Sequence, residues 1–123
     1  TGERKAAPID VRLEIARKSL AGLKNVEVRP FTGFLTDFAA QCGARILVRG
    51  LRTYNDFEYE KALYEVYKSQ NPDIETIYIM TAGVCSHISG SIVRELAHLG
   101  GSLEGYVTAS AAELVRKHYG KRG

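Results

Sequence analysis

Two arginines at the end of a short apolar run are the first candidates for binding chemistry. Arg49 closes the run, and Arg52 follows three residues later, across Gly50. Guanidinium groups present planar forks of N–H donors that bind phosphate oxygens bidentately. Because parallel sheets bind ligands beyond the carboxyl ends of their strands, this pair predicts a phosphate clamp. The residues leave an alternative open, in which the arginines pair with surface acids such as Glu58 or Glu60.

A second candidate is the polar segment of residues 86–91, Ser-His-Ile-Ser-Gly-Ser, which precedes an apolar helical pattern. The free amides and the dipole at a helix N-terminus attract anions. Ser89 and Ser91, on either side of a glycine, therefore suit contact with phosphate, and His87 could touch a base or a phosphate. Two alternatives stay open: a serine could simply cap the helix, and His87 could be a solvated loop residue.

Helical and extended patterns alternate along the chain, which indicates an α/β fold. Helices are recognised by apolar residues at helical spacing, and strands by short β-branched runs. The predicted helices cover residues 9–20, 34–41, 56–69, 89–99 and 109–119, and the predicted strands cover residues 26–28, 45–49 and 74–80. This alternation is typical of a mainly parallel sheet flanked by helices. Because three strands are few and the pattern begins with a helix, we expect a first strand that this chain lacks.

Several local features follow from the same patterns. The run 45–49 has the apolar composition of a strand buried on both faces, and Gly50 is expected to end it. Asn55 or Asp56 is expected to cap the helix that follows. Aromatic residues recur along that helix at helical spacing, so core or interface positions are favoured over a stacking platform; they are Tyr54, Phe57, Tyr59, Tyr64 and Tyr67.

The composition is that of one globular domain covering residues 1–123, with 45% hydrophobic and 25% charged residues. The net charge of +3 is spread along the chain, which favours a small anionic ligand over nucleic acid. Cys42 and Cys85 lack zinc-site spacing and indicate reduced thiols in a cytoplasmic protein. No apolar run approaches ~20 residues, so no membrane partner is expected. No signal peptide is visible, and the first residue is Thr1, which suggests a trimmed chain.

Several of these segments together resemble the signatures of bacterial phosphopantetheine adenylyltransferases. One signature corresponds to Ile-Leu-Val-Arg-Gly-Leu-Arg at residues 46–52 with Asp-Phe-Glu-Tyr-Glu at residues 56–60. The other corresponds to residues 86–91 with Val-Arg-Glu at residues 93–95, and residues 25–28 and 33–35 also fit. The resemblance implies a Rossmann-like nucleotidyltransferase fold, assembled as a homohexamer. It also implies transfer of AMP from ATP to 4′-phosphopantetheine, giving dephospho-coenzyme A and pyrophosphate by direct attack, with Mg²⁺ held on the ATP phosphates.

The same resemblance implies roles for individual residues. Arg49 would hold the phosphate of 4′-phosphopantetheine, and Phe34 and Leu35 would contact its pantetheine arm. Lys5 and Arg52 would be catalytic, no residue would ligate a metal, and coenzyme A is a possible feedback ligand. The ATP contacts implied are Gly50, Arg52, Tyr59, Glu60, Ile88, Ser89, Gly90 and Ser91.

The chain departs from the family pattern at several positions. The T/HxGH motif with its phosphate-binding histidine is absent, Tyr67 stands where asparagine is common, and Gly90 replaces one serine of a triplet. A gap-free match puts Glu3 at the place of the loop lysine, with Arg4 and Lys5 beside it. Two other functions therefore stay open: a non-catalytic nucleotide-binding module, and a related nucleotidyltransferase with another acceptor, such as nicotinamide mononucleotide or a glycerol phosphate.

Overall fold

The computed structural model describes residues 5–121, which form two compact units. The first unit combines residues 5–30 with residues 88–121, and the second contains residues 31–87. No helix among these described residues is long and apolar enough to cross a membrane. The expectation of one domain over the whole chain stays a prediction.

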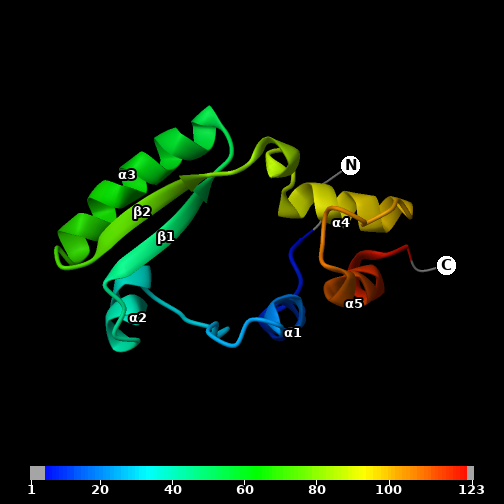
Figure 1. Ribbon diagram of the computed structural model, residues 1–123, viewed down its shortest axis with the longest axis horizontal. Helices are drawn as coiled ribbons and strands as arrows, with labels where there is room; N and C mark the ends of the chain where they lie inside the picture. Colours follow the sequence, from blue (N-terminus) through cyan, green and yellow to red (C-terminus); the bar gives the residue numbers. More distant parts are fainter. Residues whose placement is uncertain (1–4, 122–123) are drawn as a thin grey trace. The chain divides into compact units, whose positions relative to one another are not determined.

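The second unit is a strand-helix-strand arrangement preceded by a short helix. Helix α2 (Leu35–Gln41) leads into strand β1 (Ile46–Leu51), long helix α3 (Tyr54–Gln70) and strand β2 (Glu75–Met80). A single-turn helix, η1 (Gly83–Cys85), follows. The two strands pair in parallel, and α3 runs along the sheet they form (Figure 1). The predicted α/β class, with a parallel sheet flanked by helices, is confirmed.

Side chains of the two strands alternate between the face covered by α3 and the opposite face. Arg49 lies opposite Tyr78 in the register, and both side chains reach α3. A core cluster of Ala39, Leu47 and Ile74 lies at the start of the sheet, where Tyr67 of α3 packs against it. The register therefore places Arg49 one pleat beyond this core on the helix-covered face.

The opposite face shows that the prediction of a strand buried on both faces is wrong. Ile46 and Val48 are 55% and 62% exposed, and Ile77 and Ile79 beside them are also exposed. An apolar run indicates that a strand has no polar face, but burial also requires an element that packs on each face. Among the described residues, only the face under α3 is well covered.

Two predictions about the segment between β1 and α3 are also wrong. Gly50 does not end the strand, because it pairs with Ile79 and the ladder continues to Leu51. The cap of α3 is Thr53, neither Asn55 nor Asp56: its Oγ1 accepts a hydrogen bond from the Asp56 amide. The Asp56 carboxylate in turn accepts from the Thr53 amide, which completes a reciprocal capping box.

The first unit is helical. It contains α1 (Ile9–Leu20), α4 (Gly90–Leu99) and α5 (Ala109–Tyr119), and α5 packs against both of the others. Its core cluster consists of Ala97, Leu103 and Val115. The predicted limits of α1 and α5 are confirmed.

The predicted strand at residues 26–28 is wrong. These residues have no regular secondary structure, and the Val26 amide donates to the Leu23 carbonyl in a turn. Alternating β-branched residues favour extended backbone, but a strand also needs a partner for its backbone hydrogen bonds. The described part of the chain therefore contains two of the three predicted strands.

Candidate functional site

Arg49 and Glu60 form a bidentate ion pair between β1 and α3. Nε of Arg49 donates to one carboxylate oxygen of Glu60 at 3.0 Å, and Nη2 donates to the other at 2.5 Å. The Glu60 side chain is 10% exposed and that of Arg49 is 33% exposed. The hydrogen bond with Glu60 is the main cause that raises the pKa of Arg49, which remains a cation. The alternative correctly named Glu60 as a partner of this arginine, but Glu60 is a buried acid, whereas the alternative expected a surface acid.

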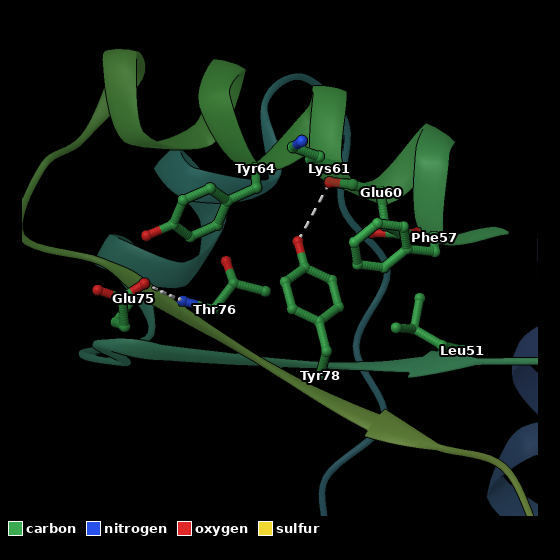
Figure 2. A pocket seen from close by; sticks show the side chains of 8 residues that line it. All are labelled: Leu51, Phe57, Glu60, Lys61, Tyr64, Glu75, Thr76 and Tyr78. Carbon is green, nitrogen blue, oxygen red and sulfur yellow. Dashed lines mark hydrogen bonds between the residues drawn. The ribbon is translucent and has the colours of Figure 1, made fainter. Parts of the chain in front are cut away.

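Tyr78 fixes the backbone of α3 at Glu60. Its hydroxyl donates to the Glu60 carbonyl oxygen at 3.2 Å, as Figure 2 shows. Burial raises the pKa of Tyr78, so its hydroxyl keeps the proton that it donates. The ring of Tyr64 meets that of Tyr78 edge-on, with centroids 6.4 Å apart. The helix is therefore held at the position that carries the carboxylate partner of Arg49.

A hollow of about 250 Å³ lies beside this pair, between α3 and the sheet. Figure 2 shows Phe57 and Tyr64 from the helix and Tyr78 from the strand pointing into it. The complete lining consists of Leu51, Phe57, Glu60, Lys61, Tyr64, Glu75, Thr76 and Tyr78. Four of these eight residues are aromatic or aliphatic, and Glu60 is the member of the ion pair that lines the hollow.

Arg52 is also paired with an acid. Its Nε lies 3.6 Å from a carboxylate oxygen of Asp56, which also accepts from the Arg52 amide at 3.0 Å. The side chain of Arg52 is partly exposed, as is that of Asp56. Gly50 lies between the two arginines within the strand, and Tyr59 is exposed on α3. The structure thus brings Arg49 and Glu60 together and places Arg52 at the start of α3.

The start of α4 combines a cap with an arginine. Ser89 is the cap, since its Oγ accepts a hydrogen bond from the Ile92 amide at 3.2 Å, which confirms the capping alternative. Nη2 of Arg94 donates to Oγ of Ser91 at 3.4 Å. The guanidinium also lies over Gly90: a methyl group added there would be 2.8 Å from Nη1 of Arg94. Ser89 therefore caps α4 in any case, whether or not an anion binds there.

The remaining predicted site residues are placed individually. Phe34 is exposed as the N-cap of α2, whereas Leu35 packs against the core cluster of the second unit. The backbone of Leu35 is thus the part that could contact a ligand. Lys5 is exposed ahead of α1, and Ile88 is half-buried ahead of α4. Glu3 and Arg4 lie outside the described residues.

The aromatic residues of α3 divide between two environments. Tyr64 and Tyr67 are half-buried against the sheet and the core, as predicted. Tyr54, Phe57 and Tyr59 are exposed, so they are not core residues of the described structure, and an interface position stays a prediction for them. Helical spacing over the whole segment could not separate these faces, since aromatic residues occur on both.

Sequence reasoning missed Tyr78, Asp56 and Arg94 as partners of the predicted site residues. Asp56 stands four residues after Arg52 on a helix start, which was a usable signal for an ion pair. Arg94 stands four residues after Gly90, which on a helix indicates the same face. Tyr78 gave no such signal, because its position beside Arg49 depends on the strand register.

Comparison with known proteins identifies the class. A model of the family described as cytidylyltransferase-like matches residues 2–96, so the chain belongs to the cytidylyltransferase-like family. Over 113 residues the chain is 37% identical to the phosphopantetheine adenylyltransferase of Staphylococcus carnosus (strain TM300). The match covers 92% of this chain and 70% of that protein. The resemblance inferred from the two signature segments is confirmed.

Proposed function

We propose that the protein transfers the adenylyl group of ATP to 4′-phosphopantetheine, giving dephospho-coenzyme A and pyrophosphate, a step of coenzyme A synthesis. The structural observation that carries this proposal is Arg49, a partly exposed cation near the carboxyl end of β1, held by a buried carboxylate. This is where a parallel sheet offers charge to a ligand. The relative named phosphopantetheine adenylyltransferase supports the choice of reaction.

The reaction needs no covalent intermediate on the protein. A phosphate oxygen of 4′-phosphopantetheine attacks the α-phosphorus of ATP and forms the new P–O bond. The bond from that phosphorus to the bridging oxygen of the β-phosphate breaks, and pyrophosphate leaves with the electron pair. The protein therefore contributes positioning and charge stabilisation. In this proposal Arg49 holds the attacking phosphate, and Phe34 and Leu35 lie along the pantetheine arm.

We assign ATP contacts separately in each unit. In the second unit they are Gly50, Arg52 and Tyr59. In the first unit they are Ile88 and residues 89–91. The position of Arg94 supports the second group, because its guanidinium adds positive charge at the start of α4, where the helix dipole also favours an anion.

Magnesium is proposed to accompany ATP. Within residues 5–121, no three His, Cys, Asp or Glu side chains are grouped as a metal site. Mg²⁺ commonly binds substrate phosphates and keeps several waters, so we propose that ATP carries it into the site. When bound, it would neutralise charge on the phosphates of ATP. Lys5 and Arg52 are the protein side chains that we propose stabilise the negative charge of the reacting phosphates.

Three further properties are proposed from the resemblance. They are assembly as a homohexamer, a cytoplasmic location, and coenzyme A as a feedback ligand. None of them alters the assignment of residues within either unit.

The experiment that tests the function is pyrophosphate release by the full-length protein with ATP, Mg²⁺ and a candidate acceptor. We expect release with 4′-phosphopantetheine and none with nicotinamide mononucleotide or glycerol phosphate. Release with one of the other acceptors would replace the proposed substrate. ATP binding without release on any acceptor would favour the non-catalytic nucleotide-binding module.

A further inference from the structure

Arg49 uses only one edge of its guanidinium group for Glu60. The group has five N–H bonds: one on Nε and two on each Nη nitrogen. Glu60 accepts from Nε and from one N–H of Nη2. Both N–H bonds of Nη1 and the second of Nη2 have no partner in the part of the chain that the structure describes. Nη1 and Nη2 together form a second bidentate edge, and its shape suits two oxygens of a phosphate.

Glu60 is a buried residue, so its carboxylate is less mobile than that of an acid on the surface. Its side chain is 10% exposed, and a buried carboxylate must be paired to remain charged at low cost. Its helix position is fixed by the Tyr78 hydroxyl, which reaches the Glu60 carbonyl oxygen (Figure 2). Tyr78 is the register partner of Arg49 in the sheet, so Arg49, Tyr78 and Glu60 connect β1, β2 and α3 at the same position along the strands. The carboxylate can therefore hold the guanidinium in one orientation.

We propose that Glu60 is a positioning residue for the acceptor phosphate and acts through Arg49. It occupies the side edge of the guanidinium and so directs the free edge toward the phosphate of the acceptor. This inference rests on the proposed function, and it differs from the direct ATP contact that the family resemblance implies for Glu60. An arginine held in this way loses less side-chain freedom when the phosphate binds, which favours correct orientation of the attacking oxygen.

The first test is Glu60→Asp in the full-length protein, which keeps the charge but withdraws the carboxylate by one methylene. We expect kcat/KM for 4′-phosphopantetheine to fall roughly tenfold or more, since small misplacements of positioning groups are costly. The dissociation constant of ATP, measured by calorimetry, should change less than about twofold, as expected when no contact to that ligand is removed. The matched control is Glu58→Asp, an exposed position of the same helix, where both constants should stay unchanged.

The second test is a double-mutant cycle with Arg49→Ala. If Glu60 acts through Arg49, Glu60→Asp should have no further effect on acceptor use once Arg49 is absent. An equal loss in both backgrounds, or a weakening of ATP binding in both, would overturn the proposal and return Glu60 to an independent role. If Glu60→Asp does not fold, Glu60→Gln keeps the side-chain length and enters the same cycle.

The cycle remains informative if the proposed reaction is wrong. Absence of pyrophosphate release by the parent protein would reject the proposed function. Calorimetric binding of 4′-phosphopantetheine to the same four proteins would still show whether the effects of Arg49 and Glu60 are coupled. If the effects of the two substitutions on that binding are additive, the positioning role of Glu60 is rejected, whatever the outcome for the proposed reaction.

Discussion

Glu75, the first residue of β2, shows how a single exposed residue links the strand to α3. Nζ of Lys68 lies 2.9 Å from a carboxylate oxygen of Glu75. The hydrogen bond with Lys68 is the largest cause that lowers the pKa of Glu75, and the backbone amide of Thr76 lowers it further. The same pair raises the pKa of Lys68. This contact fastens the last turns of α3 to the start of the second strand.

A pH dependence follows at the residue scale. Because the folded-state pKa of Glu75 lies below its unfolded value, the stabilisation is fully present above the ordinary carboxyl pKa. It is lost as the pH falls through the folded-state pKa. Lys68→Met should move the NMR titration of the Glu75 carboxyl toward its ordinary range. Lys117→Met in α5 is the control and should leave this titration unchanged; an unshifted Glu75 in Lys68→Met would contradict the assigned cause.

At the scale of the element, α3 depends on its capping box. Thr53 and Asp56 satisfy amides at the helix start, which would otherwise lack partners. Asp56 also accepts from the Arg52 amide, so the cap fixes the turn between β1 and α3. The cap lies less than two helical turns before Glu60, on the helix that carries the partner of Arg49.

Removing the hydroxyl of Thr53 tests whether α3 depends on its capping box. Thr53→Ala should lower the free energy of unfolding by about 1 kcal/mol, the usual effect of losing an N-cap. Thr53→Ser keeps the hydroxyl and should retain most of that stability. Chemical denaturation of both variants gives the comparison, and equal stability of Thr53→Ala and the parent would show that α3 does not need this cap.

At the scale of the whole molecule, each compact unit has its own cluster of buried side chains. The second unit buries Leu47 and Ile74 with Ala39, whereas the first buries Leu103 and Val115 with Ala97. Large exposed apolar residues occur in both units, including Ile79 on the sheet and Leu99 at the end of α4. We therefore expect stability to depend mainly on the residues of these two clusters.

Two leucines provide a matched test of this view. Leu103 is 2% exposed and Leu99 is 72% exposed. Leu103→Ala should lower the free energy of unfolding by about 2–5 kcal/mol, through lost burial and the cavity left behind. Leu99→Ala should stay within about 0.5 kcal/mol of the parent, as surface substitutions usually do. Comparable losses in thermal unfolding for the two variants would contradict the assignment of Leu103 to the core.

Local patterns were enough to predict the helices, the α/β class and the family resemblance. Helical spacing depends on the sequence itself, so α1 and α5 could be delimited without knowledge of their neighbours. The same kind of reasoning was wrong for residues 26–28, because a strand exists only where a second strand pairs with it. It was also wrong for Gly50, since a glycine can continue a ladder as well as end one.

The sequence alone therefore determined which residues suit phosphate chemistry: Arg49, Arg52 and the serines at the start of α4. It could not decide between Glu58 and Glu60 as the partner of Arg49. That choice belonged to the tertiary structure, because it depends on the rotation of α3 and on the strand register that places Tyr78 beside Arg49. Residue type and spacing determine which side chains can bind phosphate. The packing of α3 on the sheet determines which of them form contacts and which edge of the Arg49 guanidinium has no partner among the described residues.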